Sequence, residues 1–384
     1  MTPLRITIFL VIALSVWTLL HAYVFLRLAT VPALSQVLGT PAVAGIVALW
    51  AAYPLGRVLI SLKADAAGMP LEFAGTTWMG FLFLLFASMI AVDIVTAGGL
   101  VFVAKVPLLR GWAAAAAVLL GAAALVQGLR PPVLREYEVR LAGLPQDRDG
   151  LVLVAVSDLH LGTLIGGCWM ERLVGRVEAL KPDAVVVVGD LVDAEVGRLE
   201  SLLPVLRTLK APLGVWAVTG NHEYFAGLGR SVELLKAAGY TVLRDSAAEV
   251  APGLVLAGVD DLGARRQFGQ RDHAIEKALT ARPPGAVIFL SHSPVFAGAE
   301  EAAARGAGLM LSGHTHGGQL WPFGLLVRMS TPFVAGRYEV AGMTVIVSRG
   351  TGTWGPRMRL WRPGEILKIT LRAEPGSGAE TQQR

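Results

Sequence analysis

The hydrophobic pattern of this chain changes near residue 130. Before that point, long apolar segments with at most one charged residue each are separated by short polar loops, whereas the later apolar runs are short. A helix needs about 20 mostly apolar residues to cross the roughly 30 Å hydrocarbon core of a bilayer. Four segments meet that requirement, at residues 6–28, 42–60, 77–97 and 112–129. The pattern therefore predicts a membrane domain of about four transmembrane helices over residues 1–130.

Two other interpretations of these apolar segments are weaker. Arg5 before an apolar stretch resembles a signal peptide, but no clear small-residue cleavage site follows and three more apolar segments do. A soluble all-helical domain would have to keep water away from several apolar segments of bilayer length. We therefore expect a multi-pass protein of the cell inner (cytoplasmic) membrane.

The distribution of Lys and Arg predicts the orientation of these helices. With four spans, the amino terminus and everything after residue 130 share one side of the membrane. That side holds five basic residues and the opposite side three, namely Arg5, Arg57, Lys63, Arg130 and Arg135 against Arg27, Lys105 and Arg110. Because cytoplasmic loops carry the excess of positive charge, the part after residue 130 is expected in the cytoplasm. One helix more or fewer would invert this prediction.

After residue 130 the pattern is that of an α/β domain. Residues 135–141 alternate polar and apolar, as a strand with one wet face does. Continuous apolar runs, typical of strands buried on both faces, and other short strand candidates follow at residues 151–156, 184–188, 215–218, 254–259, 287–290, 309–311 and 344–347. Amphipathic helices are predicted between them, at 169–180, 199–209 and 231–238. We expect two packed sheets flanked by helices over residues 131–372, with a disordered tail at 373–384.

Composition and charge narrow the classes of function. The chain has 384 residues, a formal net charge of +5 and a sequence pI near 9.5. Its Arg and Lys residues are scattered and form no basic block, so nucleic-acid binding is not expected. Cys168 is the single cysteine, which excludes an internal disulfide framework and a cysteine-based zinc site. A phosphate-bearing substrate or an anionic lipid remains compatible with this charge.

Polar motifs follow five of the predicted strands and hold most of the side chains that could bind a metal. Five of the seven histidines lie in them. The motifs are Asp158-Leu159-His160, Gly189-Asp190, Gly220-Asn221-His222-Glu223, His292 and Gly313-His314-Thr315-His316. Carboxylate, imidazole and amide oxygen donors suit Mn²⁺, Fe²⁺ and Zn²⁺. One carboxylate can bridge two such ions about 3.5–4 Å apart, so the pattern predicts a pair of divalent cations.

The order and spacing of these motifs resemble the calcineurin-like metallophosphoesterase superfamily. All five motifs are intact between residues 151 and 350. The segments GHTHGGQLWP at 313–322 and SRGTG at 348–352 resemble its membrane-linked bacterial phosphodiesterase branch, which includes transmembrane proteins with a metallophosphoesterase domain. The resemblance covers about 240 residues and says little about the number of membrane helices.

The resemblance implies a role for each motif residue. One metal would be bound by Asp158, His160, Asp190 and His316, and the other by Asp190, Asn221, His292 and His314. Asp190 is shared between the two ions and is therefore counted with His222 as catalytic. His222 would lie near the phosphate, where it stabilises or protonates the leaving group. The metals would be two of Mn, Fe or Zn, and the residues alone do not select among them.

The resemblance also implies an activity, with alternatives left open. We expect a membrane-anchored hydrolase that cleaves a phosphodiester or pyrophosphate bond with a metal-activated hydroxide. A lipid-linked substrate is one option that the membrane anchor suggests. A phosphomonoesterase is the alternative within enzymes, and a non-catalytic membrane scaffold or sensor that kept the fold is the alternative outside them. Oligomeric state, membrane sidedness and the physiological substrate do not follow from the sequence.

Arginine and tryptophan alternate near the end of the predicted domain. The segment 354–362 contains Trp354, Arg357 and Trp361, and Arg349 precedes it within the SRGTG motif. Tryptophan favours membrane interfaces and arginine binds phosphate. Arg349 and Arg357 are therefore the candidate substrate-binding residues, with contact to membrane lipids as a further expectation. An edge strand with a solvated basic face is the alternative.

Overall fold

The computed structural model describes residues 3–36, 40–193, 199–270 and 273–374. Contacts divide the chain into two compact units. The helical unit comprises residues 1–129 and 355–361, and the sheet unit comprises residues 130–354 and 362–384. Of the tail predicted at 373–384, residue 373 still belongs to a strand, and residues 375–384 lie outside the described part of the chain.

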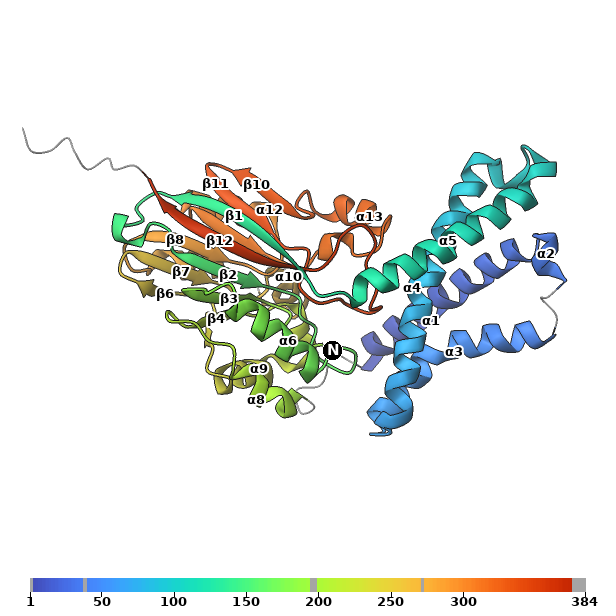
Figure 1. The fold of residues 1–384 in the computed structure, drawn as a ribbon, viewed down its shortest axis with the longest axis horizontal. Coiled ribbons are helices and arrows are strands. Elements are labelled where there is room, and N and C mark those ends of the chain that lie inside the picture. The colour runs from blue at the N-terminus through green and yellow to red at the C-terminus, as the bar shows by residue number, and fades with distance from the viewer. Residues whose placement is uncertain (1–2, 37–39, 194–198, 271–272, 375–384) are drawn as a thin grey trace, which may run out of the picture. The chain divides into compact units, whose positions relative to one another are not determined.

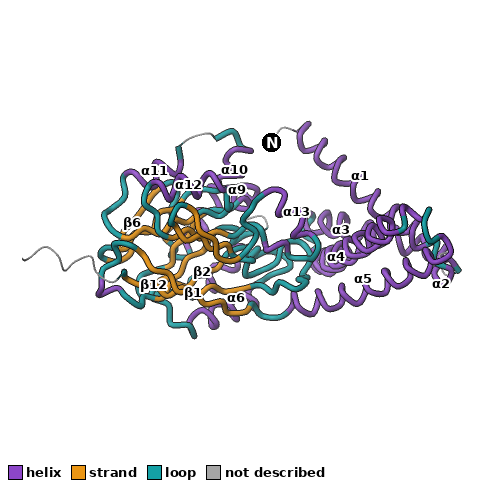
Figure 2. Tube along the Cα trace, turned by 90° about the horizontal axis from the view of Figure 1, so that it is seen from above, coloured by secondary structure: helices purple, strands orange, loops and turns teal. Residues whose placement is uncertain are grey.

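Four long helices make up most of the helical unit, coloured purple in Figure 2. They are α1 (Pro3–Leu28), α3 (Thr40–Ser61), α4 (Asp65–Val95) and α5 (Val106–Leu129), with a short α2 (Pro32–Ser35) between the first two. Each long helix contains a segment long and apolar enough to cross a membrane. α4 begins at Asp65, well before the predicted start at residue 77. Its first turns contain the charged Glu72, which accepts a hydrogen bond from Arg57 of α3 at 2.9 Å. The 3-10 turns η1 (Ala97–Gly99) and η2 (Val103–Lys105) connect α4 to α5.

Close packing within the helical unit depends on small and polar residues. A Cβ on Gly75 of α4 would overlap the Tyr53 backbone nitrogen of α3, so only glycine permits this approach. Asp93 pairs with Arg27 at 2.7 Å and with Arg110 at 2.8 Å. The returning segment 355–361 packs on α5, where the backbone N–H of Arg359 donates to the Ala124 carbonyl at 2.9 Å.

The sheet unit contains two six-stranded sheets (Figure 1). The first has the order β1-β12-β2-β3-β4-β5 and the second β10-β11-β9-β8-β7-β6. In chain order the strands of the first sheet are β1 (Val133–Leu141), β2 (Val152–Val156), β3 (Ala184–Val188), β4 (Val215–Val218), β5 (Thr241–Val242) and β12 (Glu365–Ala373). Those of the second are β6 (Ser246–Ala251), β7 (Leu254–Gly258), β8 (Ala286–Leu290), β9 (Leu309–Ser312), β10 (Gly336–Val340) and β11 (Met343–Val347). The two-sheet α/β fold predicted from the sequence is confirmed.

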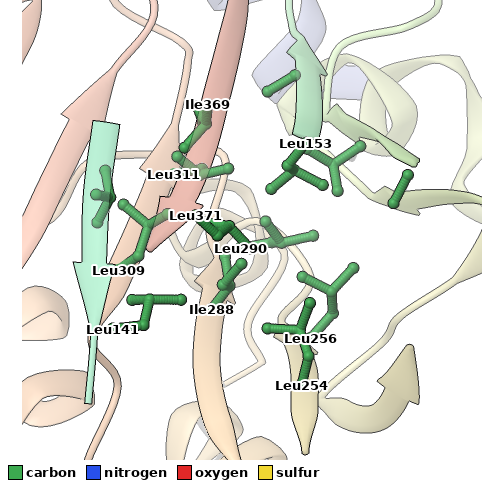
Figure 3. Packing of buried hydrophobic residues seen from close by; sticks show 14 of the residues in the cluster. Leu141, Leu153, Leu254, Leu256, Ile288, Leu290, Leu309, Leu311, Ile369 and Leu371 are labelled. Atoms are coloured by element: carbon green, nitrogen blue, oxygen red, sulfur yellow. The ribbon is translucent and has the colours of Figure 1, made fainter. Parts of the chain in front are cut away.

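The apolar core of the sheet unit has three layers. Alternate residues of both sheets face each other between the sheets, among them Leu153 and Ile369 opposite Leu256 and Leu290 (Figure 3). A second cluster packs the outer face of the first sheet against α6 (Gly167–Glu178), α8 (Leu203–Leu206) and α9 (Asn221–Ala237). A third packs the second sheet against α10 (Leu262–Gln267), α11 (Ala274–Thr280) and α12 (Phe296–Ala304). Helices therefore cover both outer faces, as continuous apolar strands require.

Some elements differ from the sequence-based expectation. The strands at 184–188 and 215–218 have the predicted bounds, whereas β5, β6, β10 and β12 were not predicted. β12 lies between β1 and β2, pairing parallel with the first and antiparallel with the second. The helix expected at 199–209 is a 3-10 turn, η4 (Glu200–Leu202), followed by the single turn of α8. Residues 354–362 form no strand, so the alternative of an edge strand there is wrong.

Candidate metal centre

The five polar motifs meet at one edge of the two sheets. Asp158, Asp190 and Asn221 follow β2, β3 and β4, which run parallel in the first sheet. His292 and His314 follow β8 and β9, which run parallel in the second. Parallel strands bring their carboxyl ends to the same edge, where α/β proteins place their ligands. The sheet topology therefore explains how motifs up to about 160 residues apart converge.

The backbone at this edge is unusual. Five motif residues have a left-handed backbone, with φ of 53° at Asp158, 49° at His160, 50° at Asp190, 71° at His314 and 50° at His316. Residues other than glycine rarely adopt this region, and each instance costs of order 1–3 kcal/mol. Such conformations are kept only where the surrounding structure enforces them, and they concentrate at functional sites.

Glycines in the motifs allow the loops to come close. A Cβ on Gly220 would overlap Asp190 Oδ1, and a Cβ on Gly313 would overlap Asp158 Oδ2. A side chain at either position would therefore displace a carboxylate. The glycine in the G-N-H-E motif and the one in the G-H-T-H motif are required by the packing of Asp190 and Asp158.

The first group of candidate ligands consists of Asp158, His160 and His316. One donor atom from each lies within 4.8 Å of the others. The Nε2 atoms of His160 and His316 are 3.1 Å apart, and His316 Nε2 is 3.4 Å from Asp158 Oδ1. Two imidazole nitrogens facing each other at this distance need a proton or a cation between or beside them.

The second group consists of Asp190, His292 and His314. Their donor atoms also lie within 4.8 Å of one another. His292 Nε2 is 3.0 Å from Asp190 Oδ2, and His314 Nδ1 is 2.8 Å from Asn221 Oδ1. The same Asp190 oxygen is 3.8 Å from His160 Nε2 of the first group. One carboxylate thus lies between the two sets of donors, in the position that a bridging ligand would occupy.

These donors fit a pair of divalent cations. Asp158 Oδ2 and His292 Nε2 are buried and have no hydrogen-bond partner among the described residues. His292 Nδ1 lies 2.8 Å from the Val188 carbonyl, to which its ring N–H donates, so Nε2 carries the lone pair whenever the ring is neutral, as it is when it binds a metal. A backbone carbonyl commonly fixes the tautomer of a metal-binding histidine in this way. Carboxylate, imidazole and amide oxygens are the donors that Mn, Fe and Zn accept.

The electrostatics of the ligands show how strongly this edge attracts positive charge. Burial alone would raise the pKa of the Asp158 carboxyl, but His316 and His292 lower it below its usual value. The Asp190 carboxyl is likewise buried, and His292 and His160 hold its pKa well below the usual range. Burial opposes a charge on His292, yet Asp190 and Asp158 raise its pKa well above the usual value. Both carboxylates therefore stay ionised in a site shielded from water.

Asp193 is a site residue that sequence reasoning missed. Its Oδ1 lies 2.7 Å from His222 Nδ1 and 3.5 Å from His160 Nδ1. Burial opposes its charge, but hydrogen bonds to the two histidines lower the pKa of Asp193 to about 2. In turn, although burial acts against it, Asp193 and Asp190 raise the pKa of His222. A second carboxylate three residues after Asp190 in the same loop was the available signal.

Glu223 holds two of the loops together through backbone contacts. Its Oε2 accepts hydrogen bonds from the backbone N–H of Gly220 at 2.6 Å and of Asp190 at 3.0 Å, and its Oε1 accepts one from Val192 at 3.2 Å. Burial and the charge of Asp190 raise the pKa of this carboxyl. Glu223 therefore fixes the G-D loop to the G-N-H-E loop.

The two candidate substrate-binding arginines fall in different units. Arg349 lies in the sheet unit beside the His316 loop, since a Cβ on Gly317 would lie 3.1 Å from Arg349 Cγ. Its backbone N–H and its Nε face Glu365, at 2.9 Å and 3.6 Å. Arg357 belongs to the helical unit, in the segment that packs on α5. Substrate binding by either residue stays a prediction.

Comparison with known proteins agrees with the motifs. The family model described as calcineurin-like phosphoesterase matches residues 151–318. A transmembrane protein with metallophosphoesterase domain from Danio rerio is 38% identical over 258 residues, which cover 65% of this chain and 59% of that protein. An uncharacterized metallophosphoesterase from Aquifex aeolicus is 37% identical over 245 residues, covering 63% of this chain and 92% of that protein.

The matches differ in how much of each known protein they cover. The chain spans about 60% of the length of the first two curated relatives it matches. Among solved structures, a 5'-nucleotidase precursor from Thermus thermophilus has a TM-score of 0.35 and 17% sequence identity, covering 57% of this chain and 54% of that chain. A likeness this distant carries no functional argument.

Proposed function

The chain belongs to the calcineurin-like phosphoesterase family, and on that premise we propose that it is a membrane-anchored, two-metal hydrolase of phosphodiester or pyrophosphate bonds. The observation that carries this proposal is the position of Asp190. Its Oδ2 lies 3.0 Å from His292 and 3.8 Å from His160, so that one carboxylate serves both groups of donors.

The candidate ligands divide the work of holding two cations. Asp158, His160 and His316 would hold one, His292, His314 and Asn221 the other, and Asp190 both. When bound, two divalent cations offset the charge of a phosphoryl group and lower the pKa of water, which supplies a nucleophile near neutral pH. The buried carboxylates and the backbone amides that contact them keep these donors in place without rearrangement.

His222 is the proposed proton donor to the leaving group. Its Nδ1 is bound to Asp193 at 2.7 Å, which fixes the ring and leaves Nε2 to face a substrate. Its backbone N–H donates to Asp190 Oδ1 at 2.9 Å, which holds the start of α9 against the shared carboxylate. A positioned histidine of this kind contributes about 10²–10⁴-fold to the rate when it transfers a proton in the transition state.

The test uses the purified full chain in detergent with Mn²⁺. We expect hydrolysis of bis(p-nitrophenyl) phosphate that EDTA abolishes and that Mn²⁺ restores. Asp190→Asn and His292→Ala should both abolish it. His273→Ala is the matched control, because the His273 side chain is 83% exposed and lies outside the motifs.

The same assay separates the alternatives. Turnover of p-nitrophenyl phosphate without turnover of the diester would assign a phosphomonoesterase. Protein that binds two equivalents of Mn²⁺ and hydrolyses neither these esters nor a pyrophosphate bond would instead support a scaffold or sensor. Both results would contradict the diesterase proposal.

The proposed location follows from the apolar helices and the basic residues around them. We place the protein in the inner membrane as a multi-pass protein, with the sheet unit in the cytoplasm and with a phosphoester as its substrate. A phosphatase reporter and a fluorescent reporter fused in turn after Arg384 distinguish the two sides. Activity of the phosphatase reporter alone would overturn the orientation.

A further inference from the structure

Helix α13 (Phe323–Ser330) exposes an apolar surface that water does not favour. None of its eight residues is buried. The exposed fractions are 45% for Phe323, 58% for Leu325, 56% for Leu326 and 84% for Met329, and Trp321 just before the helix is 55% exposed. Large apolar residues gathered on one short helix mark a surface that another molecule or a membrane covers.

This helix is attached directly to the metal centre. It begins seven residues after His316, and a Cβ on Gly318 would overlap Gly324 Cα, so the helix rests on the loop that carries His316. The Gln319 side chain of that loop donates to the Trp354 carbonyl at 2.9 Å and accepts from the Trp354 backbone N–H at 3.0 Å. The loop therefore positions α13 and Trp354 together.

Aromatic side chains continue the apolar surface to the catalytic candidate His222. The ring centroid of Trp354 lies 6.0 Å from that of His222, and the centroid of Phe225 lies 5.8 Å from it. Trp354 and Phe225 are 55% and 52% exposed. We call α13 with Trp321, Trp354 and Phe225 the apolar rim. A rim of this kind suits an amphiphilic molecule better than a small polar one.

Three arginines lie beside the rim. Arg328 is on α13. Arg349 and Arg362 both lie next to Gly317, since a Cβ there would be 3.1 Å and 3.3 Å from their side chains. Burial and the positive charges of Arg349 and Arg328 lower the pKa of the Arg362 guanidinium, so the three charges act on one another. Apolar and aromatic residues with neighbouring cations are the composition of a surface that binds anionic lipid.

We propose that the apolar rim and its arginines lie on the surface of an anionic phospholipid bilayer, and that the metal centre takes a phosphoester presented by that bilayer. The inference rests on the proposed function and names its substrate class. A bilayer is available to every copy, because α5 is apolar enough to span it and only residues 130–132 separate α5 from β1.

A bilayer fits the rim better than a second copy of the chain does. The charge on the rim is complementary to anionic headgroups, whereas two copies would bring Arg328, Arg349 and Arg362 against the same three charges. Each Lys or Arg near an anionic surface adds to the attraction. Insertion of Phe323, Leu325 and Met329 into the boundary between headgroups and acyl chains adds to that attraction.

The experiment places a fluorescent probe on α13 of the full chain. Cys168 is replaced by Ser, Met329→Cys is labelled with NBD, and the protein is reconstituted in phosphatidylcholine vesicles with about 30% phosphatidylglycerol and a doxyl-labelled lipid. We expect the doxyl lipid to quench the probe about twofold or more, with weaker quenching when phosphatidylglycerol is left out or Arg328→Glu is added. Lys236→Cys, on an exposed position of α9, is the matched control and should not be quenched.

Other outcomes overturn the inference without touching the proposed function. Hydrolysis of bis(p-nitrophenyl) phosphate, measured on the same vesicles, reports the metal centre separately from the rim. A probe at position 329 that is quenched no more than the probe at 236, in vesicles that keep this hydrolysis, excludes the bilayer. Burial of the probe that grows with the number of copies per vesicle assigns the rim to a second copy. Leu325→Cys provides a second labelled position if Met329→Cys fails to reconstitute.

Discussion

The helical unit exposes large apolar side chains of the kind that the sheet unit buries. In the sheet unit Leu256 and Leu290 are almost fully buried, whereas in the helical unit Leu119 is 71% exposed and Ile94 is 75% exposed. An apolar surface of that extent is stable against lipid and not against water. The helical unit therefore has the surface of a membrane domain, and the sheet unit has the buried core of a domain in water.

Buried charges distinguish the units as well. In the helical unit, Arg110 is buried with Asp93, and Glu72 is buried with Arg57, so these groups have partners of opposite sign. In the sheet unit the buried carboxylates of Asp158 and Asp190 face histidines instead of arginines, at 3.4 Å for His316 and 3.0 Å for His292. Buried charges must be paired or bind a metal. The first arrangement joins carboxylates to arginines, whereas the second gathers carboxylates and histidines, the donors that two cations would complete.

The largest effect expected from this contrast is at Asp190. Asp190→Asn removes the charge shared by both groups of donors, so we expect turnover of the chromogenic diester to fall about 10³-fold or more, which is about 4 kcal/mol. Metal analysis should find fewer than two equivalents bound. Asp147→Asn, at an exposed carboxyl of the same unit, is the control and should keep full activity. Wild-type turnover in Asp190→Asn would show that the paired donors are structural.

A matched pair of leucines tests the opposite burial directly. Leu256→Ala leaves a cavity between the sheets, and we expect it to lower the free energy of unfolding by about 2–5 kcal/mol. Leu119→Ala removes a side chain that faces outward from α5, and we expect a change below about 0.5 kcal/mol. Denaturant titration of the full chain in detergent, followed by near-ultraviolet circular dichroism, measures both. Equal losses would mean that Leu119 is packed against protein.

Asp193 tests whether pairing within the metal centre has a catalytic purpose. Asp193→Asn keeps the shape of the side chain but weakens its hold on His222, so we expect kcat to fall about 10–100-fold, as for other residues that support a site from behind. Both metals should stay bound. The loss should be larger for esters with poor leaving groups, because those depend most on proton donation. A uniform loss across leaving groups would indicate a structural role only.

The smallest effect is expected for the ion pair in the helical unit. A double-mutant cycle with Arg110→Met and Asp93→Asn should give a coupling energy of about 1 kcal/mol, since polar contacts between membrane helices average about 0.6 kcal/mol. The change should appear in thermal stability, with diester turnover unaltered. A loss of turnover equal to that of Asp193→Asn would mean that the ion pair of the helical unit supports hydrolysis and not only stability.

Sequence pattern predicted those elements whose signal is local. The runs at 184–188 and 215–218 are wholly apolar and bounded by polar residues, and their bounds matched the structure. β12 contains apolar and polar residues in alternation, but its partners β1 and β2 are more than 200 residues away in the sequence. The residues of β12 alone do not indicate with which strands it pairs. α4 extended beyond its predicted start because a partner on α3 accommodates Glu72.

The candidate site was predictable to the extent that motifs define it. The donors assigned to each cation by resemblance lie in the corresponding groups of the structure, although their role as ligands is a proposal. Asp193 was missed because sequence spacing does not show that its side chain faces His222. The apolar rim was hidden for a similar reason, since the apolar residues of α13 look like core residues until their exposure is known.

The left-handed backbone at Asp158, His160, Asp190, His314 and His316 has a consequence for inheritance. Glycine at any of these five positions would relieve about 1–3 kcal/mol of backbone strain and would also remove a candidate donor. A descendant in which the donors have no use could therefore gain stability by losing them. Retention of all five would indicate that the donors are used.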